Sequence, residues 1–168
     1  RHGGRIEIDS IKGKGTVFSL LLPITVEEFT ELTPEAAPSV AGPLRVFVVD
    51  DQEIICELLA EHLRADGHEV AYAFDGAEAL KTFMATPFDL VITDQSMPGL
   101  NGEELAREIR KKHPHVPVIL LTGFGDEMKE SGILPEGISM VLSKPVAASD
   151  LRRAVFDAVQ DGANARRT

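Results

Sequence analysis

The chain has 168 residues, a formal net charge of −10 at pH 7 and a single cysteine, Cys56, and its length suffices for one ordinary hydrophobic core with additional segments. The acidic balance argues against binding to nucleic acid or to an acidic membrane surface, and a lone cysteine excludes an intramolecular disulfide framework and fits a reducing compartment. No apolar stretch approaches the roughly 20 residues of a membrane span and no secretory signal is present, so we expect a cytoplasmic fragment without membrane contact, although a longer parent could be membrane-anchored.

The first residues predict a β-hairpin. Residues 5–9 alternate polar and apolar side chains, a Gly-Lys-Gly turn follows at residues 13–15, and a second apolar run ends at Pro23. An isolated two-stranded hairpin is marginal in water, so we expect another folded segment to cover it.

This hairpin resembles the closing strands of the ATP-binding domain of sensor histidine kinases. The segments that carry the resemblance are His2-Gly3-Gly4-Arg5-Ile6, Gly13-Lys14-Gly15-Thr16-Val17-Phe18 and Leu22-Pro23. The resemblance implies that residues 1–23 are the carboxyl-terminal remnant of such a domain and that the parent protein is a histidine kinase. The ATP-binding boxes and the phosphorylated histidine of that family would precede residue 1, so this fragment has no complete kinase site. The alternative is an unrelated hairpin.

Residues 24–43 differ in composition from both flanking regions. They are rich in Glu, Pro, Ala, Ser and Thr, and three prolines, Pro34, Pro38 and Pro43, interrupt regular structure. Such a segment cannot bury enough apolar surface to offset the entropy lost on ordering. We therefore expect a flexible acidic linker.

Residues 44–161 predict a single α/β domain, and residues 162–168 a short polar tail. Runs of four or five mostly β-branched or large apolar residues, typical of strands buried on both faces of a parallel sheet, occur before Asp50, Asp94, Thr122 and Lys144. Residues 69–73 form a weaker strand. Helical patterns follow, starting after Asp51, near Gly76, after the capping residue Asn101, near Asp126 and near Asp150. Five strands alternating with five helices predict a doubly wound parallel sheet. Its flavodoxin-like order, 2-1-3-4-5, is taken from known folds of this class.

Polar residues end four of these strands at the carboxyl edge of the sheet, where open α/β sheets bind ligands. Asp50, Asp51 and Asp94 would meet there. Carboxylates held close together repel one another unless a cation is bound. Mg²⁺ suits the site because it keeps several waters and is usually held by one or two carboxylates together with phosphate oxygens.

The same edge carries the groups that phosphoryl transfer requires, namely an acceptor, a metal and donors around the phosphoryl oxygens. Asp94 is the expected acceptor, because a carboxylate can carry a phosphoryl group covalently. Thr122 can donate its hydroxyl to a phosphoryl oxygen, and Lys144 supplies a compact positive charge. We predict Asp94, Thr122 and Lys144 as the catalytic residues.

In this combination the chain closely resembles the receiver domain of two-component response regulators. The acidic pair Asp50-Asp51, then Asp94 with Met97-Pro98-Gly99, then Thr122 and Lys144-Pro145 stand in the family's order and approximate spacing. The resemblance implies that Asp94 accepts a phosphoryl group from the phosphohistidine of a histidine kinase or a histidine phosphotransfer protein. It also implies that the backbone carbonyl of Ser96 completes the Mg²⁺ ligands and that the Lys144-Pro145 peptide bond is cis.

One position departs from the family. Many receivers have Tyr or Phe three residues before the lysine, and this chain has Val141. The usual readout through an inward-turning aromatic ring is therefore in doubt, and the glycine-flanked loop after Thr122 is an alternative route for output.

Together these features predict a fragment of a bacterial hybrid histidine kinase, with a receiver that acts in a phosphorelay. A docking module that needs no phosphorylation stays open as an alternative, as does a homodimer formed through the hairpin or a receiver face. A phosphohydrolase with an aspartyl phosphate on its first strand is disfavoured. That family needs a second Asp two residues after its nucleophile, and this chain has Gln52 and Glu53 there.

Overall fold

The computed structural model describes residues 5–21, 42–123, 125, 128 and 134–165. The chain divides into two compact units, Arg1–Glu35 and Ala36–Thr168, and each is described by itself. The predicted linker lies almost entirely outside the described residues. Of the predicted tail, residues 162–165 belong to the last helix and residues 166–168 lie outside the described residues. Among the described helices, none combines the length and the apolar character that crossing a membrane requires.

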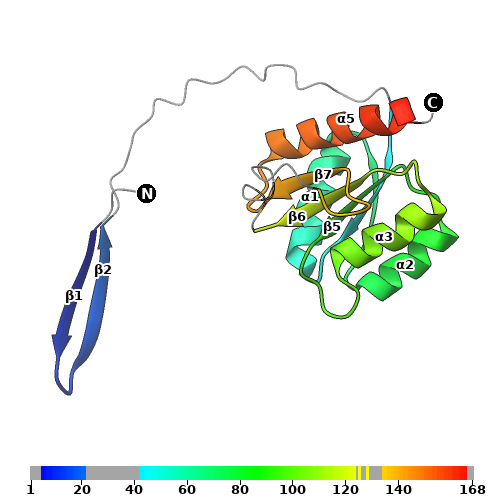
Figure 1. Ribbon diagram of the computed structural model, residues 1–168. Coiled ribbons are helices and arrows are strands. Elements are labelled where there is room, and N and C mark those ends of the chain that lie inside the picture. The colour runs from blue at the N-terminus through cyan, green and yellow to red at the C-terminus, as the bar shows by residue number, and fades with distance from the viewer. Residues whose placement is uncertain (1–4, 22–41, 124, 126–127, 129–133, 166–168) are drawn as a thin grey trace, which may run out of the picture. The chain divides into compact units, whose positions relative to one another are not determined.

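The first unit contains the predicted antiparallel hairpin of β1 (Arg5–Ile11) and β2 (Gly15–Leu21) (Figure 1). Its turn is closed by a hydrogen bond of 2.9 Å from the backbone N–H of Lys14 to the carbonyl of Ile11. Gly13 and Gly15 adopt φ values of 82° and 115°, a region that glycine enters without steric cost. Every residue of both strands is exposed. The hairpin prediction is confirmed, and its origin in an ATP-binding domain stays a prediction.

The second unit is built on a five-stranded parallel sheet in the order β4-β3-β5-β6-β7. Its strands are β3 (Arg45–Val49), β4 (Glu69–Ala73), β5 (Leu90–Asp94), β6 (Val118–Thr122) and β7 (Met140–Ser143). Counted within this unit, the strand order is 2-1-3-4-5, as predicted. The central strand β5 lies between β3 and β6, so the residue that ends it reaches the middle of the carboxyl edge.

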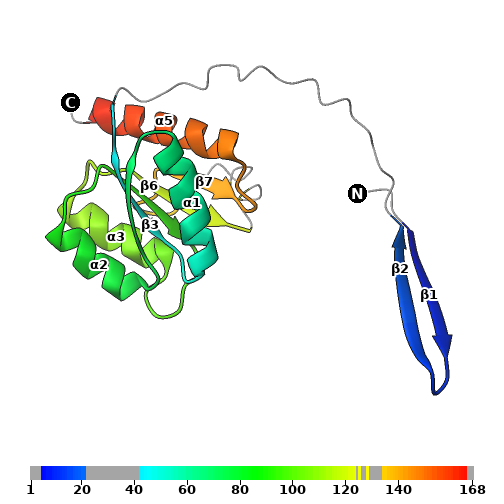
Figure 2. The same cartoon turned by 180° about the vertical axis from the view of Figure 1, so that it is seen from behind.

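Helices cover both faces of the sheet in the described part of this unit (Figures 1 and 2). They are α1 (Glu53–Ala65), α2 (Gly76–Ala85), α3 (Gly102–Lys112) and α5 (Ala148–Ala165). Residues of α2 and α3 pack on one face, and residues of α1 and α5 pack on the other. The helix expected near Asp126 falls mainly outside the described residues and stays a prediction.

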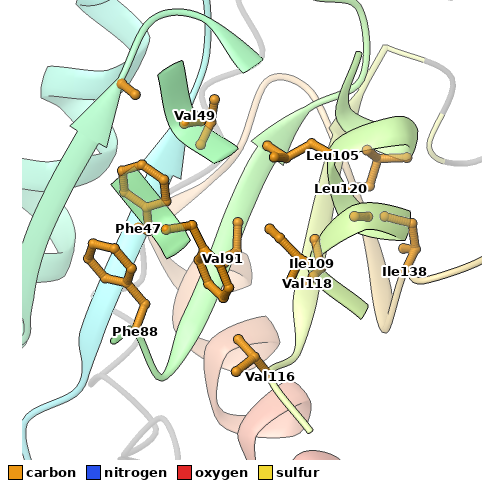
Figure 3. Close-up of a cluster of buried hydrophobic side chains, with 14 of the residues drawn as sticks. Phe47, Val49, Phe88, Val91, Leu105, Ile109, Val116, Val118, Leu120 and Ile138 are labelled. Atoms are coloured by element: carbon orange, nitrogen blue, oxygen red, sulfur yellow. The ribbon is translucent and has the colours of Figure 1, made fainter. Parts of the chain in front are cut away.

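The core explains why the strand sequences are continuous apolar runs. In β5, Val91 packs in the cluster beneath α2 and α3, whereas Leu90 and Ile92 pack in the cluster beneath α1 and α5. Successive strand residues point to opposite faces, so a sheet covered on both sides needs apolar residues throughout. On the first face, the rings of Phe47 and Phe88 stack with centroids 4.5 Å apart (Figure 3).

Two helices begin next to the carboxyl edge with side-chain caps. Asp75 accepts hydrogen bonds from two backbone N–H groups at the start of α2. Asn101 and Glu104 form a reciprocal capping box at the start of α3, as predicted for Asn101. The next residue, Gly102, lies so close to the strand that an added Cβ would stand 2.1 Å from the carbonyl oxygen of Asp94. Helix α3 therefore starts directly against the end of the central strand.

Candidate functional site

Strand order and register bring the predicted catalytic residues to one edge of the sheet. Asp94 ends β5 opposite Leu121, and Thr122 ends β6 opposite Ser143, the residue before Lys144. Asp50 directly follows β3, the strand on the other side of β5. Asp50, Asp94 and Thr122 are buried at this edge.

The ammonium group of Lys144 bridges the two buried carboxylates. Its Nζ lies 2.7 Å from Oδ2 of Asp50 and 2.6 Å from Oδ1 of Asp94. Asp50 is 0% exposed and Asp94 is 7% exposed, so both charges are shielded from bulk water. Buried charges are costly unless they are paired and hydrogen-bonded, and the bridge pairs both carboxylates with a single cation.

Backbone N–H groups satisfy the remaining carboxylate oxygens. The N–H of Gln52 donates to Oδ1 of Asp50 at 3.0 Å, and the N–H of Ser96 donates to Oδ2 of Asp94 at 2.6 Å. Each of the four oxygens therefore has a donor. This arrangement fixes both carboxylates in position.

The surroundings favour the charged form of Lys144. Burial alone would lower its pKa, but the hydrogen bonds and negative charges of Asp50 and Asp94 outweigh burial, so the pKa of Lys144 lies above its ordinary value. The residue therefore carries a positive charge at neutral pH. The Lys144-Pro145 peptide bond is cis, as the resemblance implied.

Thr122 contacts a residue that the sequence analysis did not single out. Its side chain is buried, and its Oγ1 donates to Oε1 of Gln95 at 2.5 Å. The Gln95 amide in turn donates through Nε2 to Oε1 of Glu103 at 2.9 Å. The one sequence signal for these contacts is the position of Gln95 directly after Asp94. That position does not specify Thr122 and Glu103 as the partners of Gln95.

The remaining predicted ligands, Asp51 and Ser96, are exposed beside the buried pair. In the described parts of the chain, no three His, Cys, Asp or Glu side chains are gathered as a metal site. Mg²⁺ does not require such a group, because it is usually held by one or two carboxylates and waters. Asp50 and Asp94 already share one cation, the Lys144 ammonium, and their hard oxygen atoms fit another. Asp51 and the Ser96 carbonyl as ligands stay predictions.

The unusual residue Val141 lies inside the protein. It is 2% exposed and packs in the same core cluster as Ala106 and Ile109 of α3. A small branched side chain thus fills the position that the predicted family often gives to an aromatic ring.

The fold and this edge define a class: a doubly wound α/β domain with two carboxylates, a hydroxyl and a lysine at the carboxyl edge of its sheet. The family pattern described as "Response regulator receiver domain" matches residues 46–156. The chain belongs to the response regulator receiver domain family.

Comparison with individual proteins gives the same result. The sensor kinase CckA of Brucella abortus is 29% identical over 169 residues, which cover 94% of this chain and 18% of CckA. The transcriptional regulatory protein GlrR of Escherichia coli is 35% identical over 123 residues, which cover 73% of this chain and 28% of GlrR. The structure of response regulator TrrA from Thermotoga maritima in complex with Mg²⁺-BeF has a TM-score of 0.62 and 38% identity, and the match covers 68% of this chain and 97% of TrrA. The chain thus spans less than a third of either curated relative.

Proposed function

We propose that this chain is a phosphoacceptor module of a two-component phosphorelay, in which Asp94 takes a phosphoryl group from a phosphohistidine. The observation that carries the proposal is the Lys144 ammonium bridging Asp50 and Asp94 at the carboxyl edge. A fixed positive charge there lies within hydrogen-bond distance of both the acceptor and a second carboxylate. This grouping is suited to stabilising the negative charge that gathers around a transferring phosphoryl group.

Each residue has a distinct task in the transfer. A carboxylate oxygen of Asp94 forms a bond to phosphorus while the phosphorus–nitrogen bond of the donor breaks, and the imidazole leaves with the bonding electron pair. Lys144 pairs with a phosphoryl oxygen, and Thr122 donates its hydroxyl to another. Asp50, Asp51, Asp94 and the Ser96 carbonyl would hold Mg²⁺, which when bound neutralises charge on the phosphoryl oxygens. The structure of TrrA in complex with Mg²⁺-BeF supports Mg²⁺ as the metal of this site.

The parent protein is, in this proposal, a bacterial hybrid histidine kinase. Residues 1–23 would be the end of its ATP-binding domain, residues 24–43 the linker, residues 44–161 the receiver and residues 162–168 a tail. Two observations support it: the described hairpin, and the alignment with CckA over 94% of this chain compared with 73% for GlrR. The phosphodonor would be a histidine kinase domain or a histidine phosphotransfer protein in the cytoplasm, with no nucleic acid involved.

The test is the intact mass of the chain after incubation with acetyl phosphate, with and without Mg²⁺. We expect the wild type to gain one phosphoryl group only when Mg²⁺ is present, and Asp94→Asn to gain none. Asp161→Asn, a change at an exposed position near the end of α5, is the matched control and should behave like the wild type.

Two results would count against the proposal. A gain that survives in Asp94→Asn would show that another residue is the acceptor. No gain from acetyl phosphate, and none from a phosphorylated histidine kinase, would favour a docking module that needs no phosphorylation.

A further inference from the structure

We propose that Gln95 is a positioning residue that holds the hydroxyl proton of Thr122 until Asp94 is phosphorylated. This inference rests on the function proposed above and extends it to a residue outside the predicted catalytic set. Three contacts carry it: Thr122 to Gln95, Gln95 to Glu103, and the backbone bonds that fix Gln95 itself.

The hydroxyl of Thr122 has one proton to donate. In the structure it donates that proton to Oε1 of Gln95, from a side chain that is 2% exposed. While this proton is donated to Gln95, it cannot also form a full-strength hydrogen bond to a phosphoryl oxygen. Phosphorylation of Asp94 and the bond to Gln95 therefore compete for one donor.

Glu103 fixes which end of the Gln95 amide faces Thr122. The amide Nε2 donates to Oε1 of Glu103 at 2.9 Å, so the amide oxygen is left to accept from Thr122. Turning the amide over would set its oxygen against the Glu103 carboxylate, and two acceptors repel one another. Glu103 is in the first turn of α3, where the helix dipole favours a negative charge.

The backbone of Gln95 is held by two elements. Its N–H donates to the carbonyl of Leu121 in β6 at 2.9 Å, and its carbonyl accepts from the N–H of Gly102 at the start of α3 at 3.2 Å. The Gln95 side chain therefore reaches Thr122 from a fixed position. When a phosphoryl oxygen accepts the Thr122 hydrogen bond instead, the Gln95 amide oxygen loses its donor beside the start of α3.

The test measures how tightly the 168-residue chain binds beryllium fluoride with Mg²⁺, followed by ¹⁹F NMR. Gln95→Leu removes the acceptor and should raise the apparent affinity by about two- to tenfold, the range that one net hydrogen bond provides. In a Thr122→Ala background the same substitution should change nothing, because Gln95 acts through the hydroxyl.

Glu103 supplies a second test that does not depend on altering Gln95. Glu103→Gln keeps an acceptor for the Gln95 amide and should stay near the wild-type affinity. Glu103→Ala removes that acceptor and should shift the affinity in the same direction as Gln95→Leu.

The outcomes separate this inference from the proposed function. A wild type that neither binds beryllium fluoride with Mg²⁺ nor gains a phosphoryl group overturns both. A wild type that does so, with Gln95→Leu equal to it or weaker, overturns the role of Gln95 alone. An equal shift with and without the Thr122 hydroxyl would also overturn it.

Discussion

Replacing Lys144 by Met tests how much the bridge at the carboxyl edge contributes to folding. Met keeps most of the aliphatic stem and removes the charge, leaving the carboxylates of Asp50 and Asp94 buried without their shared cation. Breaking a buried ion pair by removing one partner costs about 3–5 kcal/mol. The Lys144 side chain is 25% exposed, so we take the lower end and expect a loss of about 3 kcal/mol in the free energy of unfolding.

Mg²⁺ should offset this loss if the two carboxylates bind it. A ligand at about 100 times its Kd stabilises the folded state by about 2.7 kcal/mol. In Lys144→Met the carboxylates have no competing ammonium, so the stabilisation by Mg²⁺ should exceed that of the wild type. The assay is urea unfolding followed by circular dichroism at pH 7, once with EDTA and once with saturating Mg²⁺.

The matched control is Lys111→Met. Lys111 pairs with Glu108 on the surface of α3, where the two side chains are 60% and 41% exposed. Exposed pairs of this kind contribute about 0–1 kcal/mol. If Lys144→Met in EDTA were as stable as this control, or if Mg²⁺ stabilised it no more than the wild type, the reasoning about the bridge would be refuted.

Two further predictions concern the neighbourhood of the site. Gly102→Ala places a Cβ 2.1 Å from the carbonyl oxygen of Asp94 and should cost about 1–3 kcal/mol in the free energy of urea unfolding. Gly123→Ala meets no atom of the described residues within 4 Å and should change that free energy by no more than about 0.5 kcal/mol. Equal effects of the two substitutions would contradict this account. Burial, followed by the charge of Asp50, raises the pKa of the Cys56 thiol from 9.0 to about 11. Between pH 9 and pH 11 the thiol is therefore ionised more in the unfolded chain than in the folded protein. The contribution of Cys56 should lower the free energy of unfolding as the pH rises through this range. Cys56→Ala should flatten the unfolding free energy over that range, and an unchanged slope would contradict the raised pKa.

Much of the fold could be predicted because its signals are local. A strand covered on both faces needs an unbroken apolar run, so residues 90–94 were recognisable as a buried strand without knowledge of their neighbours. Asn101 predicted the start of α3 for the same reason, because a capping side chain bonds to backbone groups within the first turn of its own helix. The residues that end the strands followed directly, and these include the buried Asp50, Asp94 and Thr122.

The rotation of α1 was decided by packing. Apolar residues surround Cys56 in the sequence, yet Leu58 is 47% exposed while Cys56 and Leu59 are buried. The buried residues follow one stripe at spacings of three and four, Cys56, Leu59, Ala60 and Leu63. Several apolar stripes were available, and the position of the helix on the sheet selected this one.

The sequence by itself determined which residue types arrive at the carboxyl edge, because each lies at the end of a locally coded strand. Only the tertiary structure decided which of them touch. Lys144 and Asp50 are 94 positions apart, and their contact depends on the order and register of strands that no local pattern encodes. The bond from Thr122 to Gln95 likewise exists because β5 and β6 are neighbours and α3 starts directly against β5, so that Glu103 can orient the amide.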